Sequence, residues 1–190
     1  MRRTPTIAVI AVLSATLTGC AGRTATPVAA PAPSASASVA PAVPVEADIY
    51  AQVLRRYLTT GESATGPVST VYVLDRAFPD AADPMARPVG GTPIAPDSQR
   101  YVTAALAAVA PVTFVADRDS VLEKPNGCTR VKGGGMLVTL GTVAGDGSTA
   151  QVGVNGFVAC LGATWLTYVL RREPGTGWRV TGTTGPMAIA

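Results

Sequence analysis

The sequence contains no histidine. Because imidazole is the usual general base for serine and cysteine nucleophiles, its absence excludes Ser-His-Asp and Cys-His catalysis. It also excludes zinc sites built on histidine and haem held by histidine. Lysine is nearly absent as well, with only Lys124 and Lys132 present. These absences remove the commonest hydrolytic machineries, and no motif predicts a cofactor or a metal.

Charged residues are scarce, at 14% of the chain, and their distribution excludes a nucleic-acid partner. The formal net charge is +3, but Arg2, Arg3 and Arg23 account for the whole excess. Residues 46–190 carry 12 basic and 12 acidic side chains, so their net charge is zero. A protein that binds the phosphate backbone normally presents a basic face, and none is predicted here.

The N-terminus has the pattern of an export signal. Arg2 and Arg3 precede a mostly apolar run over residues 7–17, which is typical of a secretory signal peptide. The run is too short to span a bilayer, which takes about 20 residues. The sequence Leu17, Thr18, Gly19 and Cys20 then follows.

These four residues resemble the lipobox of bacterial lipoproteins. The resemblance implies that residues 1–19 are removed and that Cys20 becomes the N-terminus, with a diacylglyceryl group on its sulfur. Two or more acyl chains hold a protein firmly at a membrane. We therefore expect a lipid-anchored, extracytoplasmic protein at the outer face of the cell membrane. An ordinary secretory signal with a cysteine at this place by chance is the alternative.

A linker is predicted between Cys20 and the folded domain. Of residues 21–45, 17 of 25 are alanine, proline or serine. Five prolines prevent a continuous helix, and such a composition buries too little surface to fold. The remaining 145 residues, 46–190, are predicted to form one domain with its own core.

Hydrophobic patterns within 46–190 predict an α+β fold. A helical stripe covers residues 46–60, and a second helix begins at Pro96 and ends before Pro111. Strands are expected over residues 69–75, 112–116, 136–143, 150–158, 164–172 and 178–183. A long irregular loop is expected over 76–96. We predict two helices packed on a mostly antiparallel sheet with a C-terminal four-stranded meander.

The C-terminal half resembles exported proteins of high-GC bacteria. The resemblance is carried by the segments 154–157 (Val-Asn-Gly-Phe), 168–171 (Tyr-Val-Leu-Arg) and 178–180 (Trp-Arg-Val). It implies no activity and assigns no catalytic residue.

With Cys20 assigned to lipid, Cys128 and Cys160 remain as a pair in an oxidising compartment. This favours a disulfide between them. Two free, buried thiols are the alternative.

Carboxylates remain as candidate catalytic groups. Asp75 ends one predicted strand, and Asp117 and Asp119 follow the next. A pair of carboxylates could hydrolyse a glycosidic bond, although no spacing points to such a pair. Trp165, Tyr168 and Trp178 are predicted core residues, with a ligand platform as the alternative.

The sequence therefore favours a non-catalytic binding or interaction module. Its expected partners are the membrane, through the lipid, and an envelope protein or cell-wall component. The alternatives are a carboxylate-dependent hydrolase of envelope polymers, which would need Asp75, Asp117 and Asp119 in one pocket, and a small-ligand binding protein with an apolar pocket between its layers.

Overall fold

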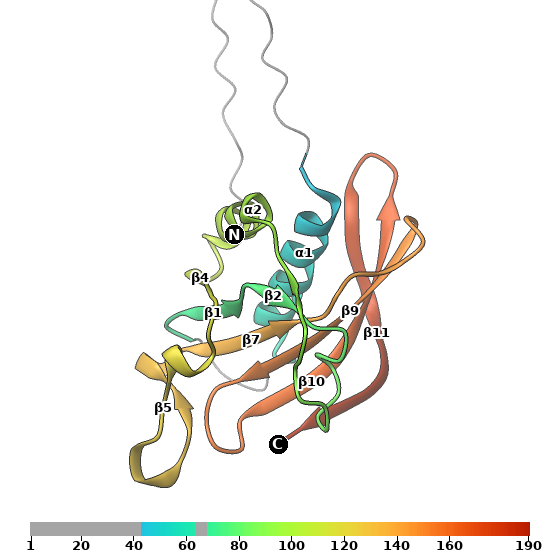
Figure 1. The fold of residues 1–190 in the computed structure, drawn as a ribbon. Helices are drawn as coiled ribbons and strands as arrows, with labels where there is room; N and C mark the ends of the chain where they lie inside the picture. Colours follow the sequence, from blue (N-terminus) through green and yellow to red (C-terminus); the bar gives the residue numbers. More distant parts are fainter. Residues whose placement is uncertain (1–42, 64–67) are drawn as a thin grey trace, which may run out of the picture. The chain divides into compact units, whose positions relative to one another are not determined.

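A computed structural model describes residues 43–63 and 68–190. Two α-helices and one seven-stranded mixed sheet make up the main architecture (Figure 1), so the predicted α+β class is confirmed. The helices are α1 (Val45–Thr59) and α2 (Pro96–Leu106). The strands of the large sheet are β1 (Val71–Leu74), β4 (Val112–Val115), β7 (Met136–Leu140), β8 (Ala144–Gly145), β9 (Thr149–Phe157), β10 (Ala163–Glu173) and β11 (Gly177–Ile189).

Two small ribbons and three short turns complete the described chain. Strands β2 (Arg76–Ala77) and β3 (Thr92–Pro93) pair with each other inside the segment expected to be an irregular loop. Strands β5 (Leu122–Glu123) and β6 (Arg130–Val131) form the second ribbon. The 3₁₀ turns are η1 (Asp119–Val121), η2 (Pro125–Gly127) and η3 (Lys132–Gly134).

The sheet runs in the order β11-β10-β9-β7-β1-β4, and β8 extends it beside β9. Strand β1 is parallel to both of its neighbours, β4 and β7, whereas the pairs from β7 to β11 are antiparallel. The sheet is therefore mixed. The parallel pair β1–β4 arises because α2 connects the two strands, and a connection that includes a helix returns the chain in the same direction.

The helices begin where the chemistry of the sequence suits a helix N-terminus. Pro44 precedes α1, and its first turn carries Glu46 and Asp48, whose charges suit the positive end of the helix dipole. Pro96 opens α2 at a position where a missing N–H costs nothing. Helix α2 ends at Leu106, one turn before the predicted stop at Pro111.

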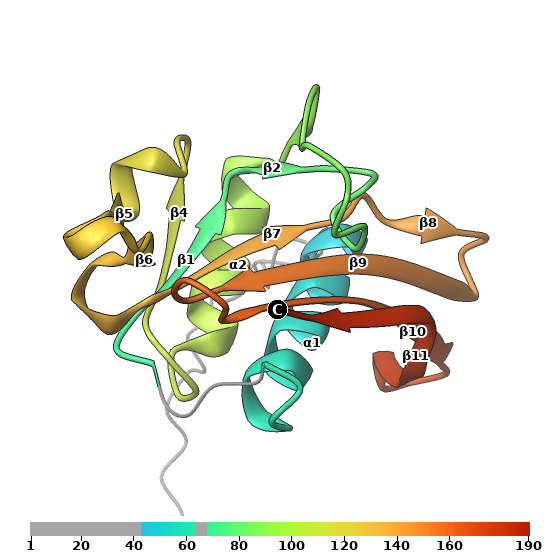
Figure 2. The ribbon, with the colours of Figure 1, turned by 90° about the horizontal axis from the view of Figure 1, so that it is seen from below.

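Both helices cover the same face of the sheet (Figure 2), and the main core lies between the helices and the sheet. Side chains alternate along each strand, so β7 turns Met136, Val138 and Leu140 toward the helices. The other face carries a smaller cluster that contains Leu74 and Leu137. Neither helix of the described residues covers this second face, and the candidate site lies on it.

The predicted signal peptide (1–19), Cys20 and most of the predicted linker (21–45) lie outside the described residues. All described residues belong to one compact unit, residues 40–190. Within the described ranges, neither helix has the length and apolar character that a membrane crossing requires.

Candidate functional site

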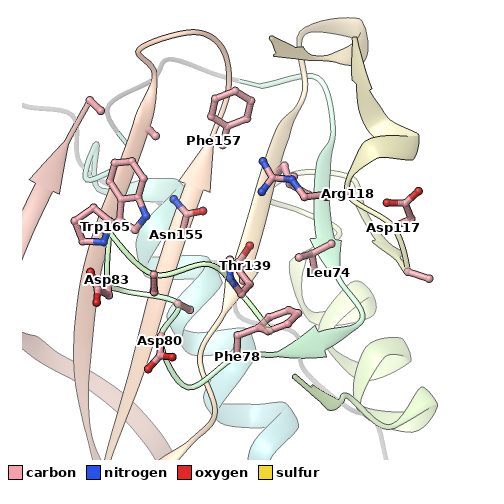
Figure 3. Close-up of a pocket in the computed structure, with 18 of the residues that line it drawn as sticks. Leu74, Phe78, Asp80, Asp83, Asp117, Arg118, Thr139, Asn155, Phe157 and Trp165 are labelled. Atoms are coloured by element: carbon pink, nitrogen blue, oxygen red, sulfur yellow. The ribbon is translucent and has the colours of Figure 1, made fainter. Parts of the chain in front are cut away.

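A pocket of about 440 Å³ lies on the helix-free face of the sheet (Figure 3). Strand register explains its floor. Thr139, Asn155 and Trp165 lie side by side on β7, β9 and β10 and form one row, since Thr139 pairs with Asn155 and Asn155 pairs with Trp165. Leu137 and Phe157 are partners in the next row, two residues along. The volume lies within the range usual for small-molecule sites.

The walls come from segments far apart in the sequence. One wall is the segment 78–88, here called the pocket loop, which follows β2. Another is the segment 116–118, which leaves the end of β4. The turn between β9 and β10 contributes Cys160 at the rim. The pocket therefore lies beside the carboxyl ends of the parallel strands β1 and β4.

Glycines let the pocket loop lie close to the sheet. A Cβ atom at Gly153 would be 3.0 Å from the backbone nitrogen of Ala82, which is tighter than nine in ten real Cβ contacts. A Cβ at Gly91 would be 2.6 Å from the ring of Phe78. The Phe78 backbone N–H also donates to the carbonyl of Leu140 at 2.8 Å, which fastens the start of the loop to the end of β7.

Thr139 is the most unusual polar residue of the pocket. It is only 5% exposed, and its hydroxyl has no hydrogen-bond partner among the described residues. A buried polar group without a partner costs about 1–3 kcal/mol. Buried hydroxyls are normally paired, so an exception at the floor of a pocket calls for an explanation.

Two neighbours in the same row have unused hydrogen-bonding capacity. The Asn155 side-chain amide donates from Nδ2 to the carbonyl of Thr164 at 3.1 Å, which leaves its Oδ1 without a partner in the described chain. The indole N–H of Trp165 likewise has no protein acceptor in the described ranges. The row thus presents an acceptor, a donor and a hydroxyl toward one space.

Charged groups stand around this polar row. Asp80 and Asp83 belong to the pocket loop, while Asp117 and Arg118 belong to the opposite wall. The Oδ1 atom of Asp83 accepts the backbone N–H of Met85 at 2.8 Å. Three aspartates and one arginine are therefore among the residues that line the pocket.

Arg118 makes only one long ion pair with a carboxylate of the described residues. Its closest ion pair joins Nε to Oδ1 of Asp119 at 3.9 Å, and its side chain is 53% exposed. In Figure 3 its guanidinium points into the pocket, whereas Asp117 points away from it. The terminal guanidinium nitrogens therefore remain available to a ligand.

Cys128 and Cys160 lie at disulfide distance, with Cα atoms 5.3 Å apart, as the predicted pairing requires. The pair joins the end of η2 to the turn between β9 and β10. Cys160 has a φ of +31°, which is unusual for a residue with a side chain. The bridge and this conformation together shape the rim of the pocket.

The fold does not bring the three predicted catalytic carboxylates together in one pocket. Of Asp75, Asp117 and Asp119, only Asp117 lines the pocket. The Oδ1 atom of Asp117 accepts the backbone N–H of Asp119 at 2.9 Å, so this carboxylate also stabilises the η1 turn. Within residues 43–63 and 68–190, no three histidine, cysteine, aspartate or glutamate side chains are grouped so that they could hold a metal ion.

The predicted aromatic set also divides between the two faces of the sheet. Trp165 lines the pocket, whereas Tyr168 and Trp178 belong to the main core under the helices. The pattern of alternation could have revealed this division, because Trp165 and Tyr168 are three residues apart on one strand and so face opposite ways.

Residues opposite the pocket support its floor from beneath. The hydroxyls of Tyr57 and Thr164 are hydrogen-bonded in the core, and burial raises the pKa of Tyr57. A Cβ at Gly156 would lie 1.8 Å from the Tyr57 hydroxyl oxygen. The segment 153–157 therefore alternates: Gly153, Asn155 and Phe157 face the pocket loop or the pocket, and Gly156 makes room for Tyr57.

A second buried phenol meets a carboxylate at the end of α1. The Tyr168 hydroxyl donates to Glu62, which also accepts from Thr60 at 2.9 Å and from Arg56 at 3.4 Å. Partial burial alone would raise the pKa of Glu62, but these hydrogen bonds and the Arg56 charge lower it below its ordinary value. Burial raises the pKa of Tyr168 strongly. This cluster lies on the helix side of the sheet and takes no part in the pocket.

No protein-family model, curated protein or solved structure matches this chain at a significant level. The geometry of the pocket is therefore the basis for assigning a function.

Proposed function

We propose that this chain is a membrane-anchored, extracytoplasmic lipoprotein whose domain is a non-catalytic module that binds a small ligand in the pocket. The pocket has a suitable volume, a mixed apolar and polar lining, and walls from three separate segments. Among the functions considered from the sequence, small-ligand binding accounts best for these features.

The observation that carries the proposal is the hydroxyl of Thr139, which is buried and unpaired at the pocket floor. No hydrogen bond to another described residue compensates for the burial of this hydroxyl. A ligand that hydrogen-bonds to this hydroxyl would remove the cost of burying it. Oδ1 of Asn155 and the indole N–H of Trp165 would bind the same ligand.

Two buried threonines provide a matched test. Thr139 faces the pocket without a partner, whereas Thr164, 1% exposed, is paired with Tyr57 in the core. We expect Thr139→Val to raise the free energy of unfolding by about 1 kcal/mol, since it removes an unsatisfied hydroxyl. Thr164→Val should lower it by about 1–2 kcal/mol, since it breaks a buried hydrogen bond.

The two variants should affect ligand binding differently from stability: the stabilised Thr139→Val should bind less tightly, and the destabilised Thr164→Val should bind normally. A thermal-shift screen of amino acids, short peptides, sugars and nucleosides would identify ligands of the purified protein. For each ligand found, Thr139→Val should weaken binding and Thr164→Val should not. Equal affinities for both variants and the unmodified protein would reject the pocket as the binding site.

A carboxylate-dependent hydrolase is the second candidate, and one observation favours it. Asp80, Asp83 and Asp117 line the same pocket, although two of them are not the residues that the sequence suggested. A turnover assay on envelope polymers distinguishes the two functions. Turnover that is lost in Asp80→Asn or Asp83→Asn, but not in Asp75→Asn, would support the hydrolase.

The lipid anchor is tested independently. Mass spectrometry of the protein from its native membrane should give a chain that begins at Cys20 and carries a diacylglyceryl group. An intact, unmodified N-terminus would contradict the anchor and the extracytoplasmic location together.

A further inference from the structure

We propose that the pocket takes a short peptide with a free amino terminus and a free carboxyl terminus, about three residues long. This inference rests on the proposed function and specifies its ligand. It follows from charges of opposite sign on two walls and from a polar row between them that matches a peptide group.

The pocket loop provides the site for the ammonium group. Asp80 and Asp83 both lie on this loop and line the pocket, on the side of Trp165 in the view of Figure 3. Carboxylates form strong, charge-assisted hydrogen bonds with ammonium groups. The face of an indole ring also attracts a cation. Neither carboxylate forms an ion pair within residues 43–63 and 68–190.

The opposite wall provides the site for the carboxylate group. The Arg118 guanidinium points into the pocket and makes only a distant contact with Asp119, at 3.9 Å. A guanidinium binds a carboxylate through two parallel N–H donors. A simple amine would leave Arg118 unmatched, and a simple anion would face the carboxylates of the pocket loop.

The polar row suits the amide groups between the two ends. A peptide group offers one N–H donor and one carbonyl acceptor. Oδ1 of Asn155 can accept the N–H, and the Trp165 indole can donate to the carbonyl. The hydroxyl of Thr139 can donate to the carbonyl or accept from the N–H, and Thr139 is only 5% exposed. Phe78 and Phe157 offer apolar surface to the ligand's side chains.

Strand spacing sets the length. Arg118 follows β4, whereas Ala82 of the pocket loop packs over Gly153 on β9. In the order β9-β7-β1-β4, these strands are three spacings apart, or roughly 14 Å. The charged side chains shorten this gap from both ends. An extended peptide of three residues spans roughly 10 Å and so fits between them.

The test uses alanyl-leucyl-alanine and two capped forms, the N-acetylated peptide and the C-terminal amide. Dissociation constants are measured by NMR titration of the purified protein. Each cap removes one charge, so we expect each to weaken binding about tenfold, which is the loss of one charged hydrogen bond.

Variants assign each end of the peptide to its wall. Arg118→Gln should bind the free acid and the amide equally, and Asp80→Asn with Asp83→Asn should bind the free and the acetylated peptide equally. The matched controls are Arg171→Gln and Asp75→Asn, both outside the pocket lining, and these should discriminate as the unmodified protein does.

Three results would overturn the inference: equal binding of all three peptides, discrimination that persists in the pocket variants, or no binding of the free peptide. If the free peptide fails while the screen finds another ligand that depends on Thr139, only this inference is wrong. If no small molecule binds, the proposed function is wrong as well.

Discussion

The substitution Gly156→Ala tests how closely Tyr57 approaches strand β9. The added Cβ would lie 1.8 Å from the Tyr57 hydroxyl oxygen and 2.7 Å from the adjoining ring carbon. Tyr57 is fully buried, so its ring has no free space into which to move. The clash must therefore displace the ring and break its hydrogen bond with Thr164.

Two contributions determine the size of the effect. Overpacking a dense core costs about 1–3 kcal/mol. Leaving the Thr164 hydroxyl buried without its partner costs about 1–3 kcal/mol more. The free energy of unfolding should therefore fall by about 2–6 kcal/mol, a large part of the roughly 5–15 kcal/mol typical of a domain.

Urea denaturation of a double-mutant cycle measures the coupling. Tyr57→Phe removes the closest contact, so the Gly156→Ala/Tyr57→Phe double variant should be less destabilised than the sum of the two single variants, by about 1 kcal/mol or more. Gly182→Ala is the matched control on β11, because nothing lies within 4 Å of a Cβ added there. It should change stability by less than about 0.5 kcal/mol. Additive effects of the Gly156 and Tyr57 substitutions would refute the reasoning.

Three further outcomes are expected. The lowered pKa of Glu62 means that its contribution to stability is present above its ordinary pKa of 4.5 and is lost as the pH falls through the folded-state pKa. The urea midpoints of the unmodified protein and of Glu62→Gln should therefore converge as the pH falls below that folded-state pKa. Tyr168→Phe should reduce the pH dependence, because it removes one of the hydrogen bonds that lower the pKa. Reduction of the Cys128–Cys160 bridge should lower the free energy of unfolding by roughly 3–4 kcal/mol, which is the chain-entropy value for a loop of 33 residues (128 to 160 inclusive, a separation of 32). Thiol titration of the denatured, unreduced protein should find no free thiol from this pair. Gly153→Ala should loosen the pocket loop, because the added Cβ would press on the backbone of Ala82. We expect faster proteolytic cleavage within the loop and an unchanged urea midpoint. An unchanged rate of cleavage would contradict this prediction.

The sequence alone was sufficient for the α+β class, because that class depends on local periodicity. The helical stripe of α1 and the β-branched strands bury one face each, and this requirement is visible in the order of residues. The cysteine pair was likewise predictable by counting, once Cys20 was assigned to lipid. The mixed character of the sheet was not predictable in this way, because strand order depends on which strands pair across the fold.

The pocket shows the limit of the sequence most clearly. Alternation places Thr139 and Asn155 on the face opposite the main core, but only the register of β7 with β9 makes them neighbours. Asp80 and Asp83 lie in an irregular segment with no periodicity, so nothing local could distinguish them from Asp75, one of the three predicted carboxylates. The sequence by itself determined the elements and the faces that they bury, because those follow from interactions between residues close in the chain. Only the tertiary structure decided which polar groups share a space, since that depends on contacts between strands and loops that are distant in the sequence.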